Sequence, residues 1–187
     1  AAYGAPQAGR DYAPVDISPA TLAEMYLPPF KACIDAGVQT FMSAFNDLNG
    51  EPATGSHWLL TDLLRNQWAF KGFVVSDWNA VVQLKAQGVV ENDRDAAIMA
   101  LKAGVDMDMV DGLYNAHIAD AVRKGLISEF TVNTAVERIL RQKYRLGLFD
   151  NPYAFLDKAR EQQTVRSAEL MALAREAATK SMELLKN

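Results

Sequence analysis

The strongest constraint on the fold is a regular alternation of short apolar segments with amphipathic helical segments. Residues 38–43, 72–76 and 104–109 are typical of strands, and no hairpin signal connects one to the next. The unbroken apolar run Phe73–Val75 is typical of a strand that is covered on both faces. Because strands that alternate with helices usually form βαβ units, the sequence predicts an α/β protein with a parallel sheet.

The helical segments complete this pattern. Helices are expected over residues 18–36, 56–68, 93–103, 114–124, 128–146 and 165–180. The pair Pro28-Pro29 should kink the first of them, and residues 46–55 are expected to form a loop with a tight turn at Asn49-Gly50. Three strands cannot close a barrel, but they could belong to an eight-stranded one, which takes about 250 residues. An open doubly wound sheet is the alternative, although no G-x-G-x-x-G follows a strand.

Composition excludes several classes of function. The chain has 187 residues, half of them hydrophobic, and a net charge of −4 without a basic stripe, so no nucleic-acid partner is expected. No apolar stretch approaches the roughly 20 residues of a membrane span. The single cysteine excludes an internal disulfide. His57 and His117 lack a third ligand at usable spacing, so neither a metal nor a cofactor is expected.

Polar side chains gather where the predicted strands end, which is where parallel α/β folds place their chemistry. The three strands deliver Met42, Ser43, Phe45 and Asn46; then Ser76, Asp77 and Trp78; then Asp106, Asp108 and Asp111. A carboxylate at a rigid strand end can face a pocket, and an indole beside it suits the flat C–H face of a sugar. Asp77 could equally cap the next helix, and Trp78 could belong to the core. The residues alone leave both interpretations open.

Longer passages of the sequence resemble a known family. "KGFVVSDWNA" resembles the nucleophile segment of glycoside hydrolase family 3, the β-glucosidase and β-xylosidase group. "FMSAFNDLNGEPATGSHWLLTDLLRNQWAF", "AIMALKAGVDMDM", "AVERILRQKYRLGLFDNPY" and "AREAATKSMELLKN" are similar to other passages of that family, in the same order. The resemblance implies that residues 1–153 form the C-terminal half of a (β/α)8 barrel. Residues 154–187 would then be a helical linker and the entry to an α/β sandwich domain that is missing here.

The resemblance also implies roles for particular residues. Asp77 matches the catalytic nucleophile, and Trp78 matches an aromatic wall on the leaving-group side of the sugar. Met42 and Phe45 match positions that line the pocket of the cleaved sugar, where many members carry a tyrosine instead of Phe45. Asn46 belongs to the matching "FNDLNG" turn and is a further candidate contact. The acid/base residue of the family normally comes from the second domain, so it is not expected in this chain.

The function implied is that of a retaining exo-β-glycosidase. It would remove terminal non-reducing β-D-glucosyl residues from a small carbohydrate through a covalent glycosyl-aspartate. A β-xylosidase of the same family is one alternative. Another is an incomplete barrel fragment that acts only together with the remaining parts of its enzyme. A periplasmic or secreted location is expected by analogy with the family alone.

Overall fold

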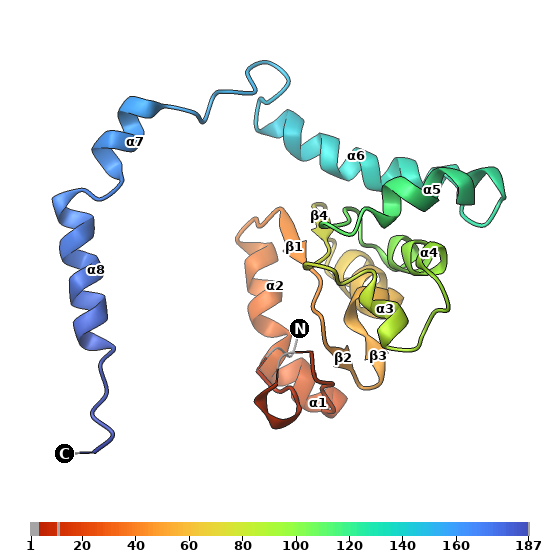
Figure 1. The fold of residues 1–187 in the computed structure, drawn as a ribbon, viewed down its shortest axis with the longest axis horizontal. Coiled ribbons are helices and arrows are strands. Elements are labelled where there is room, and N and C mark those ends of the chain that lie inside the picture. The colour runs from red at the N-terminus through yellow and green to blue at the C-terminus, as the bar shows by residue number, and fades with distance from the viewer. Residues whose placement is uncertain (1–3, 11, 187) are drawn as a thin grey trace. The chain divides into compact units, whose positions relative to one another are not determined.

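The computed structural model describes residues 4–10 and 12–186, which form two compact units, Ala1–Lys143 and Tyr144–Asn187 (Figure 1). The first unit contains η1 (Gln7–Gly9), α1 (Pro19–Thr21), η2 (Leu22–Tyr26), α2 (Pro28–Asp35), β1 (Thr40–Met42), β2 (Asp47–Leu48), β3 (Glu51–Pro52), η3 (Ala53–Gly55), η4 (Trp58–Gln67), β4 (Phe73–Val75), α3 (Gln83–Ala86), α4 (Asp93–Ala103), α5 (Leu113–Arg123) and most of α6 (Glu129–Arg145). The second contains α7 (Lys158–Thr164) and α8 (Ala168–Lys180).

The predicted parallel sheet is present as the pair β1 and β4, which lie side by side in Figure 1 with Phe41 opposite Val74. The segment expected to form a third strand makes only a single parallel bridge, between Val75 and Met107. The Val74 carbonyl accepts from the backbone N–H groups of both Asp106 (2.8 Å) and Met107 (3.1 Å). The Val74 N–H donates to the Asp106 carboxylate at 2.8 Å. Because a side chain replaces a backbone acceptor, the regular ladder does not continue, and the prediction of a full strand was wrong.

The loop expected over residues 46–55 contains a small antiparallel hairpin, β2 and β3. Asn49 and Gly50 form its two-residue turn with φ values of 53° and 85°. Positive φ at both central residues is what a tight hairpin turn of this hand requires, and Asn-Gly is its preferred sequence. The predicted turn at these two residues is therefore confirmed.

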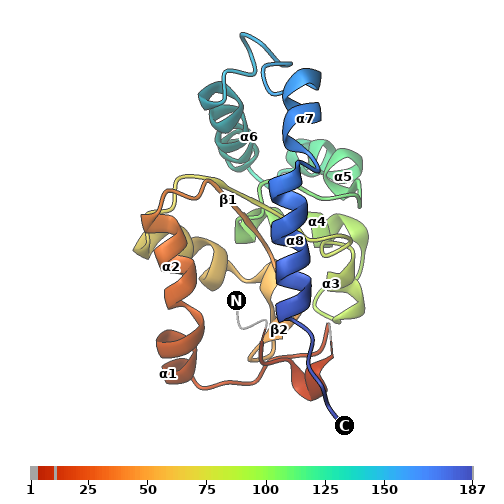
Figure 2. The same cartoon turned by 90° about the vertical axis from the view of Figure 1, so that its left-hand side faces the viewer.

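Most predicted helices are present, with local differences. The segment over residues 18–36 is divided into α1, the π-helical turn η2 and α2, which follow one another along the same side in Figure 2. Pro28 occupies the first turn of α2, where a missing N–H costs least. The helix predicted from Ser56 is π-helical as η4. The short helices α3 and α7 were not predicted.

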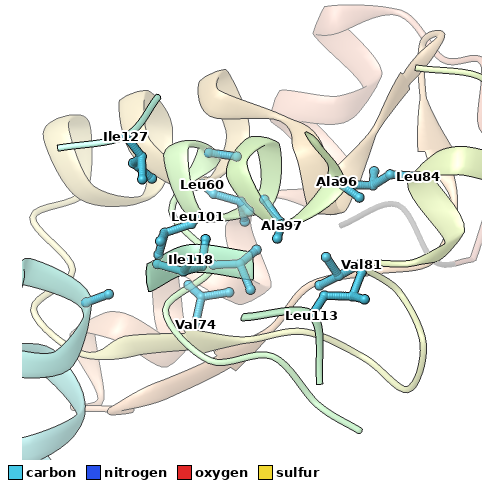
Figure 3. Packing of buried hydrophobic residues seen from close by; sticks show 14 of the residues in the cluster. Leu60, Val74, Val81, Leu84, Ala96, Ala97, Leu101, Leu113, Ile118 and Ile127 are labelled. Carbon is cyan, nitrogen blue, oxygen red and sulfur yellow. The ribbon is translucent and has the colours of Figure 1, made fainter. Parts of the chain in front are cut away.

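The core fixes the position of β4 and of the segment that follows it. Val74 is fully buried and packs with apolar side chains of η4, α4 and α5 (Figure 3). Just after the strand, Val81 and Leu84 are also 0% exposed. Fully burying such a side chain contributes about 1.5–3 kcal/mol. The residues on both sides of Asp77 are therefore anchored in the core.

The second unit consists of two exposed helices. Asp157 caps α7 by accepting from the N–H groups of Ala159 and Arg160, and Ser167 caps α8. No residue of either helix is buried. The domain boundary expected after residue 153 stays a prediction. Across the part of the chain that the structure describes, no helix combines the length and apolar character needed to cross a membrane.

Candidate active site

Burial alternates along β4 and the residues around it. Gly72, Val74 and Ser76 are buried, whereas Val75 and Asp77 are only half-buried. Successive side chains of a strand point to opposite faces, so Asp77 lies on the face opposite the helices. That face is partly exposed among the described residues, whereas the apolar run predicted burial on both faces.

The register of the sheet places further candidates on the face that carries Asp77. Met42 lies opposite Val75 in β1, and Met107 is bridged to Val75 from the other side. The side chains of Met42 and Met107 are 53% and 45% exposed. Both thioethers are therefore partly exposed at neighbouring positions of the sheet, and contact of Met42 with a sugar stays a prediction.

Asp77 and Trp78 leave the strand in a tight turn. The Asp77 carboxylate accepts from the Trp78 N–H at 2.7 Å, and the Asp77 carbonyl accepts from the Ala80 N–H at 3.1 Å. The Trp78 side chain is 59% exposed, so it is not a core residue. The structure thus presents a carboxylate and an indole next to each other at the end of a rigid strand.

Phe45 and Asn46 lie in the loop after β1 and are more enclosed. The Phe45 ring contacts Tyr12 at a centroid distance of 4.6 Å with the planes tilted by 51°. The Asn46 side chain donates to the Asp47 carbonyl at 3.1 Å, and the residue is 5% exposed. Gln87 fastens the loop by donating to the Phe45 carbonyl and the Asp47 carboxylate. Substrate contact by either residue stays a prediction.

The three carboxylates of the third segment have separate structural partners. Asp106 is buried between Arg65 and Arg138. Asp108 accepts from the backbone N–H of Tyr114 at 3.2 Å, at the start of α5. Asp111 accepts from two backbone N–H groups in the turn before α3. Asp106 and Asp108 therefore stabilise the scaffold through these contacts.

Sequence reasoning missed the role of Arg65, and it placed Ser76 at this strand end without assigning it a contact. Arg65 donates to the carbonyls of Gly72 and Gly104 as well as to Asp106. Ser76, fully buried, accepts from the Met109 N–H at 2.8 Å through its hydroxyl. The local sequence around an arginine in a helix is the same whether its side chain is buried and hydrogen-bonded or lies in solvent, so the sequence could not reveal this role. Among residues 4–10 and 12–186, no group of three or more His, Cys, Asp and Glu side chains is arranged to hold a metal ion.

Electrostatics distinguish the acidic groups near the site. Burial raises the pKa of Asp111, and the nearby carboxylates of Asp108 and Asp93 raise it further, while hydrogen bonds from two backbone N–H groups oppose the shift. Burial alone raises the pKa of Asp47. Both groups therefore hold their protons more strongly than an exposed aspartate does.

An α/β scaffold with a carboxylate and an exposed indole at a strand end has the two kinds of group that carbohydrate-binding sites combine. The chain belongs to glycosyl hydrolase family 3, since the model of that family's N-terminal domain matches residues 1–142. It is 42% identical to a periplasmic beta-glucosidase of Salmonella typhimurium over the whole chain, and 39% identical to a putative beta-xylosidase of Formosa agariphila. Both alignments cover 25% of the relative.

Solved structures give the same result. A beta-glucosidase from Listeria innocua matches 100% of the chain with a TM-score of 0.91 and 38% identity, and the match covers 26% of that protein. The chain therefore spans about a quarter of the relatives that it resembles, and its α/β fold is the one found in the corresponding part of these enzymes.

Proposed function

We propose that this chain supplies the nucleophile of a retaining exo-β-glycosidase and that Asp77 is that nucleophile. The observation that carries the proposal is the position of Asp77, two residues after the end of β4, on the half-exposed face, while Val74 and Ser76 are buried. In such enzymes two carboxyl groups stand about 5–5.5 Å apart. Asp77 attacks the anomeric carbon as the second carboxyl group protonates the departing oxygen. Water, deprotonated by that second group, then releases the sugar from the glycosyl-aspartate.

The substrate we propose is a terminal non-reducing β-D-glucosyl residue of a small carbohydrate. The beta-glucosidase of Listeria innocua has been solved with glucose, and a mutant of it with laminaribiose. In our proposal Trp78 stacks on the leaving-group side, and Met42, Phe45 and Asn46 contact the cleaved sugar. β-Xylosidase activity is the second candidate, because relatives carry that name.

The remaining catalytic parts lie outside this chain in our proposal. Residues 1–153 would form the C-terminal half of a (β/α)8 barrel, and residues 154–187 would lead toward an α/β sandwich domain that supplies the acid/base. The match to only about a quarter of each relative supports this arrangement. The chain alone is then inactive. The name of the Salmonella relative supports a periplasmic or secreted location.

The test replaces Asp77 in the full enzyme that carries the chain. Asp77→Ala should lower kcat on para-nitrophenyl β-D-glucoside by about a thousandfold or more, because the covalent route is lost. Asp62→Ala, at an exposed position of η4, is the matched control and should keep wild-type turnover.

Two further measurements complete the test. A fluorinated glucoside that slows release of the intermediate should label Asp77, as seen by peptide mass spectrometry. Label on another residue, or unchanged turnover of Asp77→Ala, would reject the role. The ratio of kcat/KM for the β-D-glucoside to that for the β-D-xyloside decides between the two candidate substrates.

A further inference from the structure

Asp111 reaches from the segment before α5 to the turn that follows Asp77. Its Oδ2 accepts from the backbone N–H groups of Val81 (3.1 Å) and Val82 (2.9 Å). The turn is thus capped by a side chain about 30 residues away along the chain. This carboxylate holds the backbone just beyond Trp78 to the rest of the core.

Asn79 connects the same carboxylate to the indole. Its backbone has a φ of 57°, a left-handed conformation that asparagine tolerates better than most residues. With its amide nitrogen toward Asp111, Asn79 donates to Asp111 Oδ1 at 2.7 Å and accepts from Trp78 Nε1 at 3.3 Å. Only this orientation satisfies both neighbours, because a carboxylate cannot donate and an indole N–H cannot accept.

We propose that Asp111 is a positioning residue which, through Asn79, fixes the orientation of the Trp78 indole and so sets recognition of the sugar on the leaving-group side. This inference rests on the proposed function for the part that concerns sugar. Trp78 is 59% exposed, so core packing does not hold its ring. An exposed side chain changes rotamer freely, whereas a ring fixed in advance loses less entropy when a sugar binds.

Burial of Asp111 supports this role. The raised pKa of Asp111 has its largest cause in desolvation by burial, and a partly buried carboxylate is stabilised by the donors that it accepts from. Losing the Asn79 contact would leave one of its oxygens without that partner. The side chain of Asn79 is therefore best oriented with its amide nitrogen toward Asp111.

Asp111→Asn separates two roles of this side chain. The first is the cap on the backbone N–H groups of Val81 and Val82. The second is the chain of hydrogen bonds from Asp111 through Asn79 to Trp78 Nε1, called the relay below. The introduced amide can keep the contacts to Val81 and Val82 only with its oxygen, so its nitrogen faces Asn79. Asn79 must then turn its oxygen toward position 111, and its own nitrogen meets the Trp78 N–H. Two donors face each other, and the hydrogen bond to the indole is lost while the cap remains.

Asn79→Asp should also disrupt the relay, but for a different reason, because it places a second carboxylate against Asp111. The reciprocal double variant Asp111→Asn with Asn79→Asp should restore the relay. The amide at position 111 then donates to a carboxylate at position 79, which accepts from Trp78 Nε1. A purely structural role for Asp111 gives no reason for the swap to rescue the single variants.

The experiment uses the full enzyme with isotope-labelled tryptophan, so that nuclear magnetic resonance reports the indole N–H of Trp78. Trp78→Phe identifies the resonance by its loss. Asp111→Asn should shift the resonance upfield and raise KM for a β-linked glucose disaccharide about threefold to tenfold. The KM for β-glucosyl fluoride, whose leaving group is too small to reach the indole, should stay within about twofold of wild type.

The swap should return both the resonance and the disaccharide KM toward wild type, and Asp120→Asn, at an exposed site on α5, should change neither. An unchanged resonance in Asp111→Asn, or a swap without rescue, would overturn the inference. A wild-type enzyme that cleaves neither substrate would refute the proposed function instead, and the resonance would still test the contact between Asp111, Asn79 and Trp78.

Discussion

Replacing Asp106 by alanine should strongly destabilise the first unit. The Asp106 side chain is 1% exposed and lies between Arg65, 2.5 Å away and 7% exposed, and Arg138, 2.8 Å away and 26% exposed. It also accepts from the Val74 N–H. Asp106→Ala therefore leaves two enclosed guanidinium groups facing each other and one backbone donor without its acceptor.

The magnitude follows from the cost of breaking a buried ion pair by removing one partner, about 3–5 kcal/mol. A domain of 150 to 250 residues loses about 2–4 °C in melting temperature for each kcal/mol. The melting temperature of the transition that includes this unit should therefore fall by about 6–20 °C, as measured by scanning calorimetry of the full enzyme at neutral pH.

Two other variants test the reasoning behind this number. Arg138→Met removes the more exposed cation and leaves the pair of Arg65 and Asp106 intact, so its effect should be less than a third of that of Asp106→Ala. The double variant Arg65→Met with Asp106→Leu removes both charges at once and should be more stable than Asp106→Ala. A fall of less than about 3 °C for Asp106→Ala, or an equal fall for Arg138→Met, would refute the argument.

Three further variants test the packing around the sheet. Gly72→Ala should cost more than about 3 kcal/mol in unfolding experiments, because its Cβ would lie 1.9 Å from the backbone oxygen of Gln39. Leu84→Ala, at a fully buried position, should cost about 2–5 kcal/mol in the same experiment. Burial raises the pKa of Tyr114 well above its ordinary value, and nearby carboxylates add to the shift. Because the folded state then holds this proton more tightly, stability should fall as the pH rises above about 10, the value for an unfolded tyrosine. Tyr114→Phe, which loses a hydrogen bond to the Val105 carbonyl, should be less stable at pH 7 but should show a shallower alkaline fall in melting temperature.

Elements defined by local pattern could be predicted from the sequence. The spacing of apolar residues predicted the parallel partners β1 and β4, and α4 begins and ends at the predicted residues. The turn at Asn49-Gly50 followed from backbone conformation alone. The position of Asp77 at a strand end was likewise predicted from the apolar run before it.

Features that depend on distant partners could not be predicted. Asp106 follows an apolar run as Asp77 does, yet it faces Arg65 and Arg138, which lie 41 and 32 residues away in sequence. The same side chain interrupts the ladder of the expected third strand. Asn46 also follows a strand end, but its loop folds back so that the residue is buried. A sequence pattern reports which residues follow a strand, not which way the chain turns after it.

The alternation of buried and partly exposed side chains along β4 has a consequence for protein engineering. Positions 74 and 76 belong to the packed interior, so a library that varies them would mostly yield unfolded clones. Positions 73 and 75 lie on the other, more open side of the same ribbon. Randomising only these two would explore new shapes beneath the carboxylate while the scaffold that holds it stays untouched.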